Sequence, residues 1–323
     1  MTVDLSVQLG DWSWRNPFTV ASGTFAAGRP YADLWSQTAT TGSADSLALS
    51  QAAPLSCLGA LTTKGVSRQP WLGNTGLRMT ETASGMLNSI GLQNPGVEAF
   101  CRDDLPWLAR QQVPVIVNVS GHSEADYVAV IERLEQEPAV SAYELNISCP
   151  NVDCGGMSFG VDPVAAGRIT ALSRAATDRP LIVKLTPNVT DITVIARAVE
   201  AAGADALSLI NTVAGLAIDR RRRQLVFERG VAGLSGPAIK PIALYAVARC
   251  HQAVNLPLIG MGGISQVEDV VDFILAGATA VAVGTATFTD PLTVPRLIRD
   301  LGQWCQDQGV TSLSELVGVA QLP

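Results

Sequence analysis

The sequence predicts an α/β protein of the (β/α)8 TIM barrel class, with inserted active-site loops. Eight short apolar, β-branched segments alternate with amphipathic stretches along the 323 residues, and several of the eight end in small or polar residues. Strands buried on both sides that alternate with helices form a parallel sheet covered by helices. Eight such strands favour a closed barrel, with the polar strand ends on its catalytic face. An open doubly wound sheet is the alternative, because a strand count does not show closure.

The strands and helices are placed by local composition and period. The expected strands are residues 19–22, 60–64, 113–119, 142–147, 181–185, 206–210, 256–260 and 280–284. The expected helices are residues 124–136, 163–177, 191–203, 237–254, 266–277 and 295–308. Within 266–277, the apolar residues Val267, Val270, Val271 and Ile274 recur three and four positions apart, as on one face of a helix.

Two segments interrupt this alternation. Residues 37–56 are rich in Ala, Ser and Thr, which predicts a surface insertion or a weak helix. Residues 66–96 contain many turn formers without a clear period, and a connection of this length favours a functional loop. No interdomain linker interrupts the pattern, so residues 1–323 are expected to form a single domain.

Composition narrows the class of protein. The net charge of -7 argues against nucleic-acid binding, which needs an excess of Lys and Arg. No apolar run approaches the roughly 20 residues of a membrane span, and the first residues lack the pattern of a signal peptide. We therefore expect a cytoplasmic location. The six cysteines are too few and scattered for a disulfide framework, and the run Arg220–Arg223 is expected to be a solvated loop.

The strongest candidate for chemistry lies in residues 144–152, ELNISCPNV, where the fourth expected strand ends. Cys149 is followed by a proline, which ends regular structure, and Asn146 and Asn151 place amides on either side of it. A thiol here can act as nucleophile or general base, because its ordinary pKa of about 8.5 is readily shifted. Most cysteines are buried structural residues, but this pattern favours a chemical role. Cys154 completes no zinc site with it, so no metal is expected.

Cations and glycines at other strand ends indicate an anionic ligand. Lys64 and Lys184 end apolar runs, where a lysine is rarely buried without a partner. Glycine-rich turns at 260–264 and 283–285 follow the seventh and eighth strands, where barrels often bind phosphate. The turn at 233–236 could add a third edge to that pocket. The absence of a G-x-G-x-x-G after the first strand argues against a nicotinamide cofactor as the primary ligand.

These residues resemble the class 1 dihydroorotate dehydrogenases over nearly the whole chain. The matching segments are ASGTF (21–25), TTKG (62–65), GMLNSIGLQNPG (85–96), NVSG (118–121), ELNISCPNV (144–152), VKLTP (183–187), INTVAGLAID (210–219), GLSGPAIKP (233–241), GMGGI (260–264) and AVGT (282–285). The cysteine at 149 is typical of class 1, and NISCPNV together with GMGGI resembles subclass 1B. The resemblance implies FMN as cofactor and a role in pyrimidine biosynthesis.

The resemblance also implies a role for each matching residue. Cys149 would remove the C5 proton of dihydroorotate while a hydride passes from C6 to N5 of FMN. The substrate carboxylate and ring amides would be held by Lys64, Asn88, Ser89, Ile90, Gly91, Leu92, Asn146, Asn211 and Thr212. FMN would be held by Ser22, Lys64, Gly65, Asn118, Asn146, Lys184, Ile210, Gly236, Gly262, Gly263, Gly284 and Thr285.

Several assignments of acceptor and partner remain open at this point. Subclass 1B implies an iron-sulfur/FAD electron-transfer subunit that passes electrons to NAD, around a homodimer core. The alternatives are a subclass 1A-like homodimer that reduces fumarate, a related flavoenzyme that oxidises dihydropyrimidines, and a non-catalytic FMN-binding scaffold. The histidines offer no competing hydrolase, because neither His122 nor His251 has a serine or cysteine beside it in a triad-like arrangement.

Overall fold

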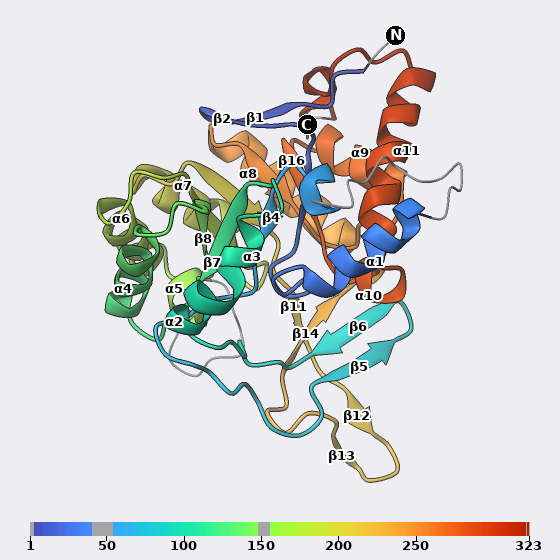
Figure 1. Ribbon diagram of the computed structural model, residues 1–323. Helices are drawn as coiled ribbons and strands as arrows, with labels where there is room; N and C mark the ends of the chain where they lie inside the picture. Colours follow the sequence, from blue (N-terminus) through green and yellow to red (C-terminus); the bar gives the residue numbers. More distant parts are fainter. Residues whose placement is uncertain (1–2, 41–53, 148–155, 321, 323) are drawn as a thin grey trace.

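A computed structural model of the chain describes residues 3–40, 54–147, 156–320 and 322. At its centre is an eight-stranded parallel sheet (Figure 1). In order of neighbours its strands are β3 (Phe18–Val20), β16 (Ala280–Val283), β15 (Leu258–Gly260), β10 (Ala206–Leu209), β9 (Leu181–Leu185), β8 (Val140–Leu145), β7 (Val115–Val119) and β4 (Leu61–Thr62). Each overlaps one of the eight strands that the sequence predicts, which confirms the predicted α/β class.

The sheet closes between its first and last strands. The backbone N–H of Gly59, just before β4, donates to the carbonyl of Phe18 in β3 at 2.9 Å. The hydroxyls of Thr19 and Thr62 are hydrogen-bonded at 3.0 Å between the same two strands and are buried. The structure is therefore the predicted (β/α)8 barrel, and the open-sheet alternative is wrong.

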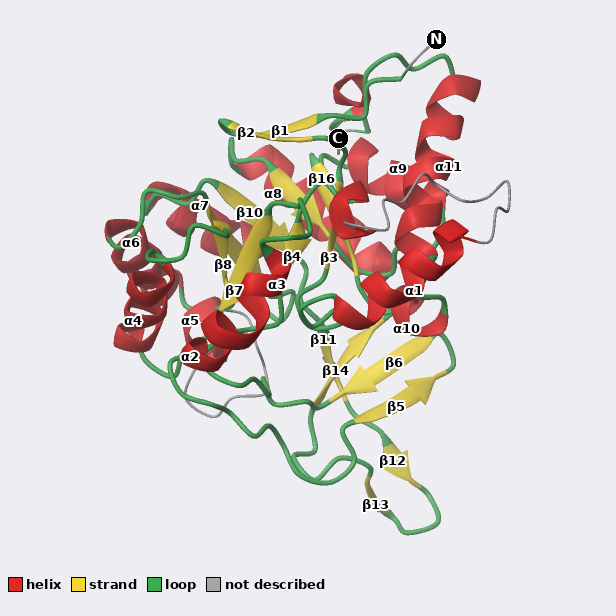
Figure 2. Cartoon of the chain, viewed as in Figure 1, coloured by secondary structure: helices red, strands yellow, loops and turns green. Residues whose placement is uncertain are grey.

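Helices cover the outside of the barrel (Figure 2). They are α1 (Arg29–Thr40), α2 (Val97–Ala99), a π-helical turn (Phe100–Asp104), α3 (Leu105–Leu108), α4 (Glu124–Leu134), α5 (Gly156–Val161), α6 (Pro163–Ala175), α7 (Ile192–Ala201), α8 (Lys240–Ala253), α9 (Val267–Leu275), α10 (Ala286–Thr289) and α11 (Thr293–Asp307), with 3₁₀ turns at Pro54–Cys57, Pro237–Ile239 and Leu313–Leu316. Side-chain caps begin several of them: Ser123 accepts from the N–H of Asp126, and Asp191 from that of Thr193. All six predicted helices are present.

Antiparallel strands extend the barrel at both ends. The hairpin of β1 (Val7–Leu9) and β2 (Trp12–Trp14) lies at one end. At the other end β11 (Val213–Gly215), β14 (Ala232–Ser235), β6 (Gly85–Asn88) and β5 (Met79–Thr82) form a four-stranded sheet, which we call the strand extension. The hairpin of β12 (Ile218–Asp219) and β13 (Gln224–Leu225) projects beyond it (Figure 1). Its tip carries Arg220–Arg223, exposed as predicted.

The two interrupting segments differ from their predictions in part. Residues 66–96 are not wholly irregular, because β5 and β6 pair within them from Met79↔Asn88 to Thr82↔Gly85. Residues 37–40 are the end of α1, which agrees with the weak helix expected for 37–56, although the sequence does not predict the start of α1 at Arg29. The end of 37–56 is the 3₁₀ turn at Pro54–Cys57. Residues 41–53 lie outside the described part of the chain.

The described helices contain none that is long and apolar enough to cross a membrane.

Candidate active site

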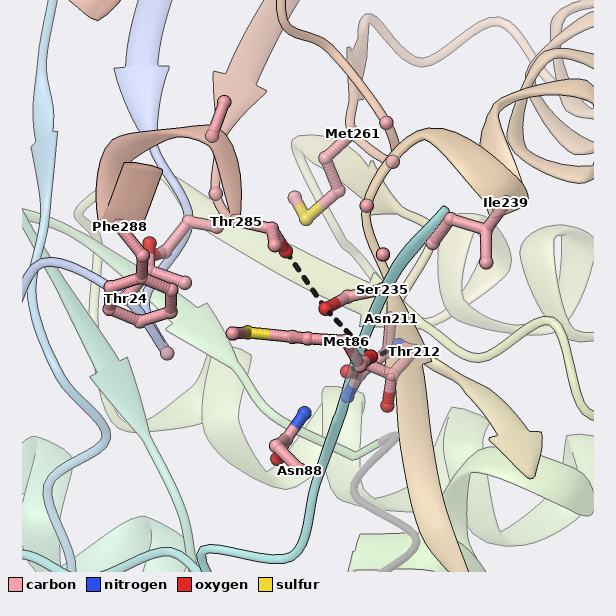
Figure 3. Close-up of a pocket in the computed structure, with 18 of the residues that line it drawn as sticks. Thr24, Met86, Asn88, Asn211, Thr212, Ser235, Ile239, Met261, Thr285 and Phe288 are labelled. Carbon is pink, nitrogen blue, oxygen red and sulfur yellow. Dashed lines mark hydrogen bonds between the residues drawn. The ribbon is translucent and has the colours of Figure 1, made fainter. Parts of the chain in front are cut away.

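A cavity of about 540 Å³ lies at the carboxyl ends of the barrel strands, beneath the strand extension. This volume is within the usual range for a cofactor or small-molecule site. Figure 3 shows that its side chains come from distant parts of the sequence: Thr24, Met86, Asn211, Met261 and Thr285 all surround one space. The carboxyl-terminal face of a (β/α)8 barrel is where active sites of this fold occur.

A buried cation lines the part of the cavity nearest the barrel interior. Lys184 on β9 is 5% exposed, and its Nζ donates to Ser22 Oγ at 3.3 Å. It also lies 3.9 Å from Oε1 of Glu144, a carboxylate on β8. A buried lysine requires such partners to offset its lost hydration. The cavity therefore has a fixed positive charge on one wall, held by neighbouring strands.

Glycine turns also line the cavity, where helices begin. Gly262 and Gly263 follow β15 with φ of 132° and 80°, values that favour glycine. Gly284 follows β16 and precedes α10, and Gly236 precedes the 3₁₀ turn that leads into α8. Backbone N–H groups at such turns and helix starts bind phosphate. This end of the cavity fits a phosphate group.

Ion pairs of Lys240 link the start of α8, near Gly236, to α9, near the turn that contains Gly262 and Gly263. Lys240, at the start of α8, contacts Asp269 of α9 at 2.5 Å and Asp272 at 2.7 Å. The other oxygen of Asp269 accepts from the backbone N–H groups of Ser265 and Gln266, directly after the glycine turn. Burial raises the pKa of Asp269, but the hydrogen bonds from Lys240, Ser265 and Gln266 outweigh burial and lower it.

Amide side chains from the strand extension and from the ends of barrel strands also line the cavity. Asn88 on β6 donates to the carbonyl of Gly233 at 3.2 Å, and Oδ1 of Asn211 accepts from the N–H of Thr212 at 2.7 Å. The carbonyl of Asn146 accepts from the hydroxyl of Tyr127 at 2.9 Å, which fixes the backbone at the end of β8. Amides both donate and accept, so they suit a planar ring with alternating N–H and C=O groups.

The structure brings most of the predicted site residues into this one cavity. Its lining includes Ser22, Lys64, Gly65, Asn88, Ile90, Gly91, Leu92, Asn118, Asn146, Lys184, Ile210, Asn211, Thr212, Gly236, Gly262, Gly263, Gly284 and Thr285. Ser89 is not among these residues; it is buried, and its hydroxyl accepts from Asn74 Nδ2 at 3.0 Å. Cys149, the predicted base, lies outside the described residues.

Sequence reasoning expected the turn at 233–236 to form an edge of the pocket and 66–96 to be a functional loop, but it did not assign four of the lining residues individually. Met79, Met86 and Ser235 come from the extension, and Phe288 from α10. Ser235 Oγ accepts from Thr285 Oγ1 at 2.8 Å, which joins the extension to the turn after β16 (Figure 3). The pair Ser84-Gly85, at the start of β6, was the turn signal that could have placed Met86. His122 is elsewhere, with its ring 4.0 Å from that of Trp71.

Among the described residues no group of His, Cys, Asp and Glu side chains could hold a metal ion. Fold and site together thus define a (β/α)8 barrel with a pocket at the carboxyl ends of its strands, lined by glycine turns, lysines and amides. A family model described as dihydroorotate dehydrogenase matches residues 4–304. The chain therefore belongs to the dihydroorotate dehydrogenase family, which confirms the resemblance noted in its motifs.

Individual relatives agree with this membership. The chain is 47% identical to the dihydroorotate dehydrogenase B (NAD(+)) catalytic subunit of Pelobacter propionicus over 321 residues, 99% of this chain and 100% of that one. It is 46% identical to the protein of the same name from Listeria innocua, over 97% of both chains. The fold is similar to that of dihydroorotate dehydrogenase from Eimeria tenella, solved with ferulenol, at a TM-score of 0.78, 20% identity and coverage of 99% of this chain and 89% of that one.

Proposed function

We propose that the chain oxidises dihydroorotate to orotate with bound FMN, in the biosynthesis of pyrimidine nucleotides. The observation that supports this proposal most directly is that one cavity is lined both by the glycine turns after β15 and β16, which suit a phosphate, and by a lysine and amides at the ends of the other strands. A single domain of residues 1–323 provides all of these groups in the proposal. The family and the names of its relatives support the same reaction.

The residues present fit FMN. The glycine turns with Gly236, Gly263 and Gly284 would hold its phosphate, and Lys184 would face the electron-rich part of its ring. Asn118 Oδ1 is buried and has no hydrogen-bond partner among the described residues, although Nδ2 of the same amide is satisfied. A buried acceptor of this kind is costly unless a ligand donates to it, and a flavin ring carries such a donor. When bound, FMN supplies the hydride acceptor.

The chain's own residues would bind and deprotonate the substrate. Lys64 and the amides of Asn88, Asn146 and Asn211 would hold the carboxylate and ring of dihydroorotate, with Thr212 and residues 90–92 completing the contacts. Cys149 follows β8 by four residues, and we assign it the removal of the C5 proton. Asn146, which lines the cavity at the end of β8, supports this placement.

We further propose that electrons leave through a second subunit that carries an iron-sulfur centre and FAD and passes them to NAD. The relatives are named as NAD(+)-dependent catalytic subunits, which favours this acceptor over fumarate. Met79 and Phe288 line the cavity and are 38% and 44% exposed, so the cavity has an apolar rim on which a partner could dock. A homodimer core and a cytoplasmic location complete the proposal.

Anaerobic mixing tests the proposed reaction. FMN-loaded protein is mixed with dihydroorotate, and the loss of flavin absorbance is followed; rapid bleaching is expected. Cys149→Ser should retain FMN but bleach at least about a hundredfold more slowly at neutral pH, because a general base contributes roughly 10²–10⁴. Cys57→Ser is the matched control, since Cys57 lies before β4 and does not line the cavity. Absence of bleaching in the unmodified protein would refute the substrate, and an unchanged rate in Cys149→Ser would refute the base.

The acceptor is tested separately. Reoxidation of the reduced protein by fumarate is compared with reduction of NAD in the presence of an iron-sulfur flavoprotein subunit. Turnover with NAD only when that subunit is added supports the proposal. Efficient turnover with fumarate by the isolated chain would favour the subclass 1A-like homodimer instead.

A further inference from the structure

A buried carboxylate lies directly behind two of the cavity-lining residues. Glu144 on β8 has a side chain that is 4% exposed and is not itself part of the cavity lining. Its Oε1 accepts from Asn118 Nδ2 at 2.6 Å, and its Oε2 accepts from Ser208 Oγ at 2.7 Å. Lys184 Nζ lies 3.9 Å from Oε1. Both oxygens thus face donors or a cation, which is the environment of a carboxylate anion.

This carboxylate determines how the two cavity residues are presented. Because Nδ2 of Asn118 donates to Glu144, its Oδ1 is the atom left for a ligand. Lys184 is held between Glu144 on β8 and the hydroxyl of Ser22, two residues after the end of β3. Glu144 therefore acts on any bound ring in two ways: it orients an acceptor and a cation, and it adds a buried negative charge behind them.

The charge has a consequence for redox chemistry. Reduction adds electron density to a flavin ring, and a nearby lysine favours that change while a nearby carboxylate opposes it. Charges in a buried site are weakly screened, so their effects extend over several ångströms. We propose that Glu144 is a positioning residue that partly offsets Lys184 and thereby keeps the reduction potential of the bound flavin low. This inference rests on the proposed function, because it requires FMN in the cavity.

A low potential suits the proposed acceptor. NAD is a weak oxidant, so electrons reach it more readily from a flavin that has been made harder to reduce. A lysine without a nearby carboxylate would raise the reduction potential of the flavin, and the reduced flavin would then transfer electrons to NAD less readily. The pairing of Lys184 with Glu144 allows the lysine to bind the ring while the reduction potential of the flavin stays low.

The test is the flavin reduction potential of Glu144→Gln, measured by equilibrating FMN-loaded protein with a reference dye. Glutamine keeps the shape and removes the charge. We expect the equilibrium constant for two-electron reduction to rise at least tenfold, which corresponds to a positive shift of about 30 mV. Glu144→Asp, which retains the charge, should stay within threefold of the unmodified protein.

Two matched controls separate charge from packing. Glu135→Gln makes the same change of charge at a carboxylate that contacts Tyr143 and Thr177 and does not line the cavity. Ser208→Ala removes one hydrogen bond to Glu144 but leaves its charge. Each should change the equilibrium constant less than threefold.

The outcomes distinguish this inference from the proposed function. An unchanged potential in Glu144→Gln, with FMN bound and reduced by dihydroorotate, would overturn the role of Glu144 and leave the reaction intact. An equal shift in Glu144→Asp or Ser208→Ala would trace the effect to packing and also overturn it. If the protein bound no FMN, both would fail. Should Glu144→Gln not fold, Lys184→Met must lower the equilibrium constant at least tenfold, and an unchanged value would refute the charge argument.

Discussion

Substitution of Gly263 by alanine is expected to weaken FMN binding by distorting the turn that holds the phosphate. Gly263 has φ of 80°, a left-handed conformation that costs a non-glycine residue about 1–2 kcal/mol. An added Cβ would lie 2.8 Å from Lys240 Cβ, 3.0 Å from the carbonyl oxygen of Gly236 and 3.1 Å from the backbone N of Lys240. Two of these three atoms belong to the backbone, so they cannot rotate away.

The magnitude follows from these two effects. Overpacking of a close contact costs typically about 1–3 kcal/mol, so together with the strained φ the apoprotein should lose roughly 2–5 kcal/mol of unfolding free energy. The turn can relieve this only by moving away from Lys240 and from Gly236, which also lines the cavity. A loss of about 1.4–2.8 kcal/mol in binding corresponds to a ten- to hundredfold weaker FMN affinity.

The assay is a fluorescence titration of apoprotein with FMN and, separately, with riboflavin, which lacks the phosphate. Gly263→Ala should weaken FMN binding and leave riboflavin binding nearly unchanged. Gly309→Ala is the matched control, since Gly309 has φ of 70° and nothing within 4 Å of the added Cβ. It should lose about 1–2 kcal/mol of stability without any change in FMN affinity. Full FMN affinity in Gly263→Ala, or an equal loss for riboflavin, would refute a phosphate site at this turn.

Three further predictions concern Asp269 and the cysteines. Asp269→Asn should weaken FMN binding about tenfold more than riboflavin binding, because it loses charge-assisted hydrogen bonds to Lys240, Ser265 and Gln266; equal losses in the two titrations would contradict this. The same variant should be less stable than the unmodified protein above about pH 5, and the difference should shrink below about pH 4. The pKa of Asp269 is lower in the folded than in the unfolded protein, so its charge stabilises the fold above the unfolded-state pKa and stops doing so as the pH falls through the folded-state pKa. Denaturant unfolding at several pH values measures the difference in stability. A difference that does not depend on pH would show that the charge of Asp269 is not its cause. Burial raises the pKa of Cys57 and Cys250 to about 12 and that of Cys101 to about 11. At pH 8 iodoacetamide should therefore label Cys149 at least tenfold faster than these three cysteines, and orotate should protect Cys149 from labelling. Peptide mass spectrometry measures both effects.

The barrel strands could be predicted from the sequence because burial on both faces leaves a continuous apolar run. Residues 181–185, LIVKL, show this most clearly, and β9 has these bounds in the structure. The strand extension could not be found in the same way. The sequence of β5, MTET, has a single apolar residue, and this residue, Met79, is exposed, so neither an apolar run nor an apolar period marks the strand.

The candidate site could likewise be predicted from the sequence only in part. Lysines and glycines at strand ends predicted the two ends of the cavity, because parallel strands bring their carboxyl ends together. Contacts between residues far apart in the sequence could not be predicted. Barrel closure depends on the contact of Thr19 with Thr62, and the environment of Glu144 depends on Asn118 and Ser208 from two other strands. Ser89 lies in a matching motif, yet its side chain faces Asn74, since neighbouring residues of an extended chain point in opposite directions.

The central claim is spatial, and a crystal structure of the protein with FMN and orotate measures it directly. We expect the phosphate at the turns of Gly263 and Gly284, the flavin ring against Lys184 and Asn118, and orotate between that ring and the thiol of Cys149. A phosphate bound elsewhere, or a Cys149 sulfur on the same side of orotate as the flavin or beyond contact with its C5 atom, would contradict the assignment.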